Sequence, residues 1–196
     1  TGTGTQTLSG ANEYSGATLI SDGTLLVNGN QSLATGAVQV NATLGGTGTA
    51  GGAVTVAATG TIAPGASTGV LTVPSADLSA GGMLAIEIDD TSTPKVDKLT
   101  VTGALNVTNA KLDFSATGTP TQSEYVIATA GSITGSIVPG NVTNKPTGYD
   151  LVQTATEIKL VLTATDYDTW AGPSGYNLSG GPTADDDGDG LTNFDE

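Results

Sequence analysis

The side chains with the most specific chemistry lie in the last twelve residues of the chain, which read DDDGDGLTNFDE. Aspartates occupy positions 1, 3 and 5 of this segment, a glycine occupies position 6 and a glutamate position 12. Ca²⁺ takes about six to eight oxygen ligands, and a loop with this order of acids and a turn-forming glycine supplies them. We therefore predict a calcium site with the ligands Asp185, Asp187, Asp189, Leu191 (through its backbone carbonyl), Asn193 and Glu196. The alternative is a solvated acidic tail that matches the pattern by chance.

A second group of acids lies in the middle of the chain and consists of Glu87, Asp89, Asp90 and Asp97. The first two alternate with isoleucines, so both carboxylates are expected on the outer face of one strand. Paired carboxylates can hydrolyse a glycosidic bond when they are suitably spaced. The segment 91–94 is typical of a loop, however, and Lys95 and Lys98 are expected to pair with these acids in solvent. We therefore predict no catalytic residues and no enzyme, and a β-helix polysaccharide lyase or hydrolase is the least favoured alternative.

The residue types that are missing exclude much other chemistry. The chain has no His and no Cys, and all five of its basic residues are Lys. It therefore lacks an imidazole base, a thiolate nucleophile, the usual nitrogen and sulfur ligands of zinc, and the arginine fork that binds phosphate. A net charge of −14 repels a nucleic-acid backbone, so we expect no nucleic-acid partner.

Several features of the sequence fit an exported protein, although no signal peptide is visible. No apolar run reaches the roughly 18 residues that a membrane-spanning helix needs, so we expect no membrane span. The sequence begins at Thr1 without a Met, and we expect it to be a processed piece of a longer protein. The absence of Cys fits a secreted bacterial protein without disulfides, and calcium loops suit extracellular calcium levels. We expect a secreted, extracellular or cell-surface location in a bacterium.

Most of the chain repeats itself at short intervals. The segments 37–40, 53–56 and 70–73 each follow a Gly, alternate in the manner of a strand, and succeed one another after sixteen and seventeen residues. This spacing predicts an all-β fold, a parallel β-helix (solenoid) whose coils stack about 4.8 Å apart and whose equivalent side chains form ladders. The alternative is a two-sheet antiparallel sandwich.

The expected organisation has four parts. The spacing loosens from about Lys111 onward, which indicates the C-terminal cap of the solenoid, and Pro and Gly residues after it indicate a linker. The predicted regions are an extended N-terminal arm at 1–7, the β-helix at 8–165 with its cap from about 111, the linker at 166–184 and the calcium loop at 185–196.

Several phrases of the sequence are similar to a known repeat. Residues 8–18 (LSGANEYSGAT) have the form L-x-G-x-N-x-Y-x-G-x-T, and residues 23–29 (GTLLVNG) continue it. Glycine- and threonine-rich phrases and closing segments follow in order at 43–49, 60–65, 84–89 and 97–103. These phrases resemble the autotransporter-associated β-strand repeat over roughly residues 8–165. The resemblance implies a right-handed β-helix in a large exported bacterial surface protein, where the repeat is a scaffold without catalytic residues.

The tail resembles other proteins. Residues 167–171, together with 185–196, are similar to the calcium-loop tails of secreted proteins from planctomycete-like bacteria. The loop also resembles half of a dockerin or a thrombospondin type 3 repeat. A dockerin has two such loops with helices, whereas this sequence has one loop.

These observations favour a non-enzymatic structural protein of the bacterial surface or extracellular matrix. A β-helix without an evident N-terminal cap presents unpaired backbone groups at its end, which predicts stacking into a fibre. The partner would then be another copy of the chain, as a homo-oligomer or homopolymer, with the calcium loop fixing the tail. The alternative is an adhesion or carbohydrate-binding module of a larger surface protein, with a surface polysaccharide as partner.

Overall fold

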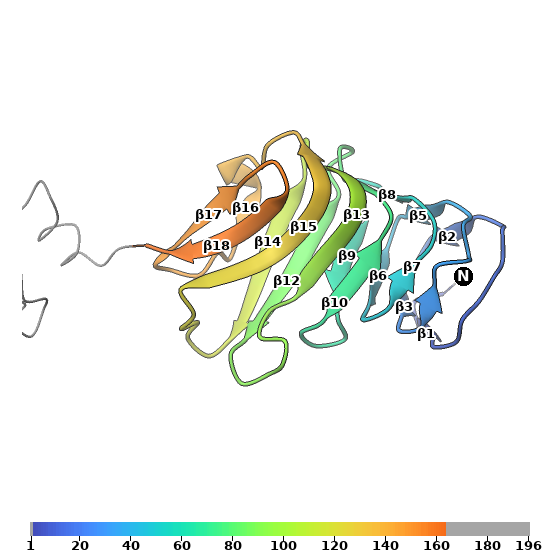
Figure 1. Cartoon of the computed structure of the whole chain (residues 1–196), viewed down its shortest axis with the longest axis horizontal. Helices are drawn as coiled ribbons and strands as arrows, with labels where there is room; N and C mark the ends of the chain where they lie inside the picture. The colour runs from blue at the N-terminus through green and yellow to red at the C-terminus, as the bar shows by residue number, and fades with distance from the viewer. Residues whose placement is uncertain (1, 164–196) are drawn as a thin grey trace, which may run out of the picture. The chain divides into compact units, whose positions relative to one another are not determined.

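The structure is a computed structural model that describes residues 2–163, and the regular secondary structure of this part is almost entirely β-strand (Figure 1). Alternating apolar and polar residues with many Thr and Val favour strands, because β-branched side chains pack well on a pleated surface. The described residues contain one short 3₁₀-helix, η1, at Pro139–Asn141. No helix among them is long and apolar enough to cross a membrane.

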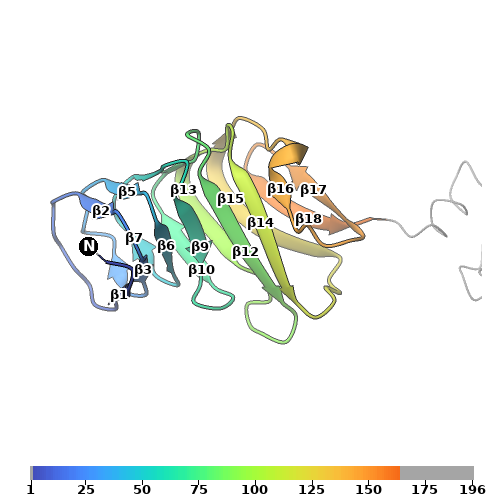
Figure 2. The same ribbon diagram turned by 180° about the vertical axis from the view of Figure 1, so that it is seen from behind.

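The first sheet has seven strands that are all parallel and follow one another in chain order. We call this sheet the first row. Figure 2 shows its central strands β6, β9, β12 and β14 side by side. Its members are β1 (Thr5–Leu8), β3 (Thr24–Val27), β6 (Thr43–Gly46), β9 (Thr61–Pro64), β12 (Met83–Asp89), β14 (Lys111–Thr117) and β16 (Val142–Thr143).

The second sheet divides into two further rows of parallel strands. The second row contains β4 (Asn30–Gln31), β7 (Thr49–Ala50) and β10 (Val70–Val73). The third row contains β2 (Thr18–Ile20), β5 (Val38–Val40), β8 (Val54–Val56) and β11 (Ala76–Asp77). The long strands β13 (Lys98–Asn106) and β15 (Glu124–Thr134) each continue both rows.

The chain therefore visits the three rows in turn, coil after coil, and each coil stacks on the one before it. β2, β3 and β4 are followed by β5, β6 and β7, and these by β8, β9 and β10. The all-β prediction is confirmed, and the arrangement is β-helix-like. The sandwich alternative is wrong, because its sheets would be antiparallel while these rows are parallel.

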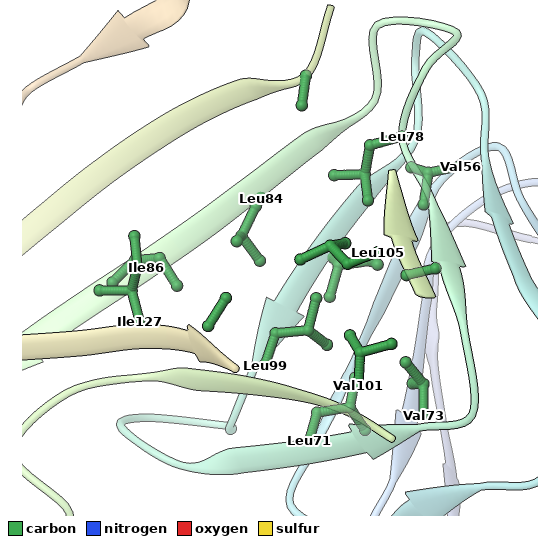
Figure 3. Close-up of a cluster of buried hydrophobic side chains, with 14 of the residues drawn as sticks. Val56, Leu71, Val73, Leu78, Leu84, Ile86, Leu99, Val101, Leu105 and Ile127 are labelled. Carbon is green, nitrogen blue, oxygen red and sulfur yellow. The ribbon is translucent and has the colours of Figure 1, made fainter. Parts of the chain in front are cut away.

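Apolar side chains of one row stack directly above one another. Along the first row the register aligns Leu25, Leu44, Ile62, Leu84, Leu112 and Val142. The four central members are buried and the two outermost are partly buried, so the ladder is shielded in the middle and more open at its ends. Side chains of all three rows meet in one core, where Leu84 and Ile86 face Leu99 and Leu105 (Figure 3). Burial of these ladders is the main stabilising contribution to the fold.

Coils become longer from the one that begins at β8 onward, and this corrects one predicted register. The expected alignment of Val38 with Val54 is confirmed, but the alignment of Leu71 with Val54 is wrong. Val54 aligns instead with Ala76, and Leu71 lies in the second row, where it aligns with Leu99. The reason is an inserted loop after β9, which lengthens this coil and moves the third repeated segment into a different row.

The last strands change direction. β18 (Glu157–Leu162) pairs antiparallel with β15, and β17 (Tyr149–Gln153) lies beyond β18 in the same sheet. The ring of Tyr149 packs on that of Tyr125 with centroids 5.6 Å apart. The edge of β15 is thus covered by strands that cannot continue the parallel stack. At the other end, β1 contains residues of the expected N-terminal arm and pairs in parallel with β3.

Candidate functional site

Three successive coils carry loops at the corner where the first row passes into the second. We call them the corner loops, and the one between β12 and β13 projects clearly from the body (Figure 1). Such loops, rather than the regular strands, carry functional side chains in repeat proteins, because they interrupt the ladders. The corner loops comprise residues 65–69, 90–97 and 118–123.

Asp97 joins the first two corner loops. Its side chain is only 4% exposed, and its Oδ1 accepts a hydrogen bond of 2.8 Å from the backbone N–H of Gly69. Its Oδ2 accepts one of 2.9 Å from the N–H of Glu87. The fit is close: Gly65 has a φ of +90°, and a Cβ there would lie 2.8 Å from the Asp97 carboxylate and collide with Ser67. Only glycine suits that position.

Burial dominates the ionisation of Asp97. Loss of solvent raises the pKa of Asp97 to about 7, although its two backbone hydrogen bonds act in the opposite direction. The nearby carboxylate of Glu87 raises the pKa further, because two negative charges repel each other. We therefore expect the carboxyl group of Asp97 to titrate near neutral pH.

Asp90 joins the second and third corner loops. One oxygen accepts the phenol O–H of Tyr125 at 2.7 Å, and the other accepts the N–H and the hydroxyl of Thr121 at 2.7 and 2.6 Å. Burial opposes its charge, but these hydrogen bonds hold the pKa of Asp90 below its usual value. The neighbouring Asp89 also has a lowered pKa, because Ser92 and Thr91 donate to it. Both carboxylates are fixed in the charged form.

A groove of about 290 Å³ lies on the outer face of the first row beside the corner loops. Small residues, including Gly45, Ala63 and Ala85, leave this space, and the first corner loop borders it. The acids that line it are Glu87, Asp97 and Asp113. Asp113 already accepts hydrogen bonds from Asn144, at 2.8 Å, and from Thr143. No aromatic side chain lines the groove.

The acid group predicted from the sequence is thus only partly brought together. Glu87 and Asp89 lie on the outer face of β12, as the alternation predicts, while Ile86 and Ile88 are buried. The positive charge of Lys95 contributes to the lowered pKa of Asp90. Neither Lys95 nor Lys98 forms an ion pair with these acids in the described structure. The ion pair of the described structure joins Lys159 Nζ to Glu124 Oε2 at 2.6 Å.

The burial of Asp97 differs from the expectation that this acid lies in solvent with its neighbours. Asp97 stands two residues before Leu99 and four before Val101, both of which are buried. Side chains two residues apart point to the same face of a strand. This parity was the available signal, and it places a carboxylate in phase with the core.

The predicted calcium ligands from Asp185 to Glu196 lie outside the described residues, and so does the predicted linker. Among residues 2–163, no three acidic, His or Cys side chains are grouped so that they could hold a metal ion. The calcium site therefore stays a prediction.

Comparisons with known proteins find similarity to autotransporter passenger proteins. Residues 1–27 match the family described as the passenger-associated-transport-repeat. Over 66 residues the chain is 47% identical to the "Adhesin BmaC autotransporter" of Brucella suis biovar 1 (strain 1330). That match covers 33% of this chain and 2% of the adhesin, so the chain spans a small part of that relative's length.

Proposed function

We propose that this chain is a non-enzymatic, right-handed parallel β-helix segment of a secreted or surface-exposed bacterial protein of the adhesin type. Two observations support the proposal. Rows of parallel strands stack apolar side chains from coil to coil, as expected of a β-helix-like scaffold. Residues 1–27 match a passenger repeat, and a stretch of 66 residues is similar to an adhesin.

The observation that carries the proposal is the uninterrupted first row, from β1 to β16, in which every pairing is parallel. The proposed surface location of the protein can be tested by immunolabelling intact and broken cells of the source bacterium. Labelling of intact cells or of the medium is expected, together with weaker attachment of cells from which the segment has been deleted. Labelling that requires cell breakage would contradict the proposal.

The non-enzymatic role is supported by how the acids are used. Asp90 and Asp97 are occupied by hydrogen bonds that connect corner loops, and no His or Arg is present to assist them. We expect no turnover when the full chain is incubated with acidic and neutral polysaccharides. Product formation that is lost in Asp89→Asn would overturn this part of the proposal.

Self-association into a fibre is the finer form of the proposal. β1 and β2 are the end strands of their rows in the described structure, and end strands offer backbone groups for pairing. At the opposite end, β18 covers β15 in the antiparallel direction, so the two ends are not equivalent. Sedimentation velocity at increasing protein concentration tests assembly, and a monodisperse monomer at the highest concentration with calcium present would exclude it.

Binding to a surface polysaccharide is the second candidate partner. Carbohydrate-binding surfaces use exposed aromatic rings, and in the described part Phe114, Tyr125 and Tyr149 are buried. Tyr14 is 40% exposed and stands alone. We therefore rank this candidate below a purely structural role, and glycan-array binding would reverse the ranking.

The calcium loop belongs to the proposed function as a site at residues 185–196. Its donor set, with carboxylates at positions 1, 3, 5 and 12, fits the hard oxygen coordination of Ca²⁺. When it is bound, the ion would neutralise part of the negative charge that the final twelve residues concentrate.

A further inference from the structure

The second row begins on a glutamine that points into the core. Register along this row aligns the inward residues of successive strands, which are Gln31, Ala50, Val73 and Val101. Gln31 is only 2% exposed, so a polar side chain occupies the first position of an otherwise apolar ladder. A buried amide is unfavourable unless its donors and its acceptor are hydrogen-bonded, so the partners of Gln31 decide what it does there.

The partners of Gln31 all lie in residues 9–17, which connect β1 to β2 and which we call the end flap. The Oε1 of Gln31 accepts the Nδ2–H of Asn12 at 2.7 Å and the backbone N–H of Asn12 at 3.3 Å. Its Nε2 donates to the carbonyl of Gly10. In the described structure, Gln31 makes every hydrogen bond that joins the end flap to the following coil.

The end flap occupies the position that β4 holds one coil later, and it covers the end of the core. The ring of Tyr14 borders the same small space as Leu25, Val38 and Leu44. Little of the flap is itself buried, because Asn12 is the one residue between 9 and 17 that is not exposed. Apolar burial therefore holds the flap weakly, and the bonds to Gln31 are its main fastening.

The two ends of the flap are positioned by close backbone packing. Gly29 and Gly36 have no side chain, which leaves room for the carbonyl groups of Gly10 and Gly16. A Cβ at either position would collide with these carbonyl oxygens. No hydrogen bond accompanies the contact of Gly16 with Gly36 in the described structure, so the middle of the flap, residues 11–15, depends on Gln31.

An open end of a β-helix attracts another chain in two ways, through unpaired strand edges and through the apolar ends of its ladders. The first and third rows end on β1 and β2, and β2 carries Leu19, which is 62% exposed. The second row differs, because the end flap lies over the edge of β4 and over the apolar side chains behind it.

We propose that the contact of Gln31 with the end flap is autoinhibitory: it keeps the second row closed to a second copy of the chain and leaves β1 and β2 for pairing. The inference rests on the proposed self-association and specifies which row is withheld from it. A second copy can reach β4 only after the flap has swung away. Its apparent affinity for that site is therefore reduced by the fraction of molecules in which the flap is open.

The experiment compares the full chain with its Gln31→Val variant. Valine continues the apolar ladder of Ala50 and Val73, so the inward face of β4 is kept while all three hydrogen bonds are lost. Hydrogen exchange by NMR should show a loss of protection of the Asn12 backbone amide by roughly tenfold or more, as expected when buried hydrogen bonds are removed. Sedimentation velocity should detect association at a concentration lower by about the same factor.

A second variant and a control make the test specific. Asn12→Ala removes the 2.7 Å bond from a largely exposed segment, and it should change both measurements in the same direction by a smaller factor. Gln39→Val alters an outward glutamine of β5, whose side chain donates to Asn41, and it should match the parent chain. If Gln31→Val does not fold, Asn12→Ala carries the test.

Protection of Asn12 that is equal in Gln31→Val and in the parent chain would overturn the inference, because other contacts would then hold the flap. A loss of protection without any change in association would overturn it as well. A parent chain that stays monomeric while Gln31→Val associates would support the autoinhibitory contact, and it would count against self-association of the parent chain under the proposed function.

Discussion

At the scale of single residues, two aspartates at the same corner of the molecule have pKa values shifted in opposite directions. Asp90 receives three hydrogen bonds from Thr121 and Tyr125 and keeps a lowered pKa. Asp97 receives two and is more deeply buried, and its pKa is raised to about 7. The balance between desolvation and donated hydrogen bonds decides which acid stays charged.

The pH dependence of stability should report Asp97. Its folded-state pKa is raised, so its protonation contributes stability that is fully present below about pH 4, the unfolded pKa, and is lost as pH rises through about 7. Asp97→Asn removes this contribution. The difference in unfolding free energy between the parent and this variant should therefore shrink from pH 4 to pH 7 and then level off, as measured by urea titrations. Curves that stay parallel would contradict the prediction.

The calcium loop makes an independent prediction at this scale. Asp187→Ala removes the ligand at position 3, and we expect at least about a tenfold loss of Ca²⁺ affinity, about 1.4 kcal/mol. Isothermal calorimetry of the full chain measures it, with Thr192→Ala as a control at a position that supplies no side-chain ligand. Unchanged calcium binding in Asp187→Ala would remove the site.

At the scale of elements, stacked ladders and corner loops have different physical origins. The ladders depend on parallel register, which places equivalent side chains of successive coils in contact. The corner loops depend on specific polar contacts between coils, made by Asp90 and Asp97. Substitutions in the two classes should therefore have distinguishable effects.

Leu84→Ala tests the ladder. Leu84 is 2% exposed and stacks between Ile62 and Leu112, so its truncation leaves a cavity and should cost about 2–5 kcal/mol of unfolding free energy. Met83→Ala, at the adjacent outward position on β12, should cost much less. Urea denaturation followed by circular dichroism measures both, and equal losses would argue against the inward ladder.

Tyr125→Phe tests the connection between corner loops. The phenol oxygen donates to Asp90 and accepts the N–H groups of Thr121 and Gln122, and Tyr125 is 2% exposed. Its removal leaves these groups without one partner and should cost about 1–3 kcal/mol. Tyr14→Phe, an exposed tyrosine with one hydroxyl contact, is the matched control. A loss of similar size in both variants would indicate no special role for Tyr125.

At the scale of the whole described part, stability should vary along the stack. In a solenoid each coil contacts only its neighbours, so end coils lose one neighbour. Coils also grow: Thr24 aligns with Thr43 nineteen residues later, whereas Met83 aligns with Lys111 twenty-eight residues later. Longer strands and full burial both favour the coils around β12 and β13.

Native-state hydrogen exchange should show this gradient. Backbone amides of β12 and β13 are expected to be the most protected, and those of β1 and β2, the end strands of their rows, the least. Mass spectrometry or NMR of the full chain gives the values strand by strand. Uniform protection from β1 to β13 would show that the stack opens as one unit.

The sequence by itself determined the class of fold and the inward face of most strands. Alternation fixes which side chains of β5, β8 and β12 are buried, because successive residues of a strand point to opposite faces. The sixteen-residue repeat of Val38 and Val54 likewise fixed one true register. The resemblance of the first phrases to an autotransporter repeat agrees with the match of residues 1–27 to the passenger-associated-transport-repeat.

Only the tertiary structure decided where long loops shift the register and which acid is buried. Leu71 has the same local pattern as Val54, and only the length of the intervening loop places it in another row. Asp97 becomes a buried junction because the first corner loop folds over it and donates the N–H of Gly69. Local alternation places Asp97 in phase with Leu99, but it does not show the loop that covers the carboxylate or the loop length that sets the row of Leu71.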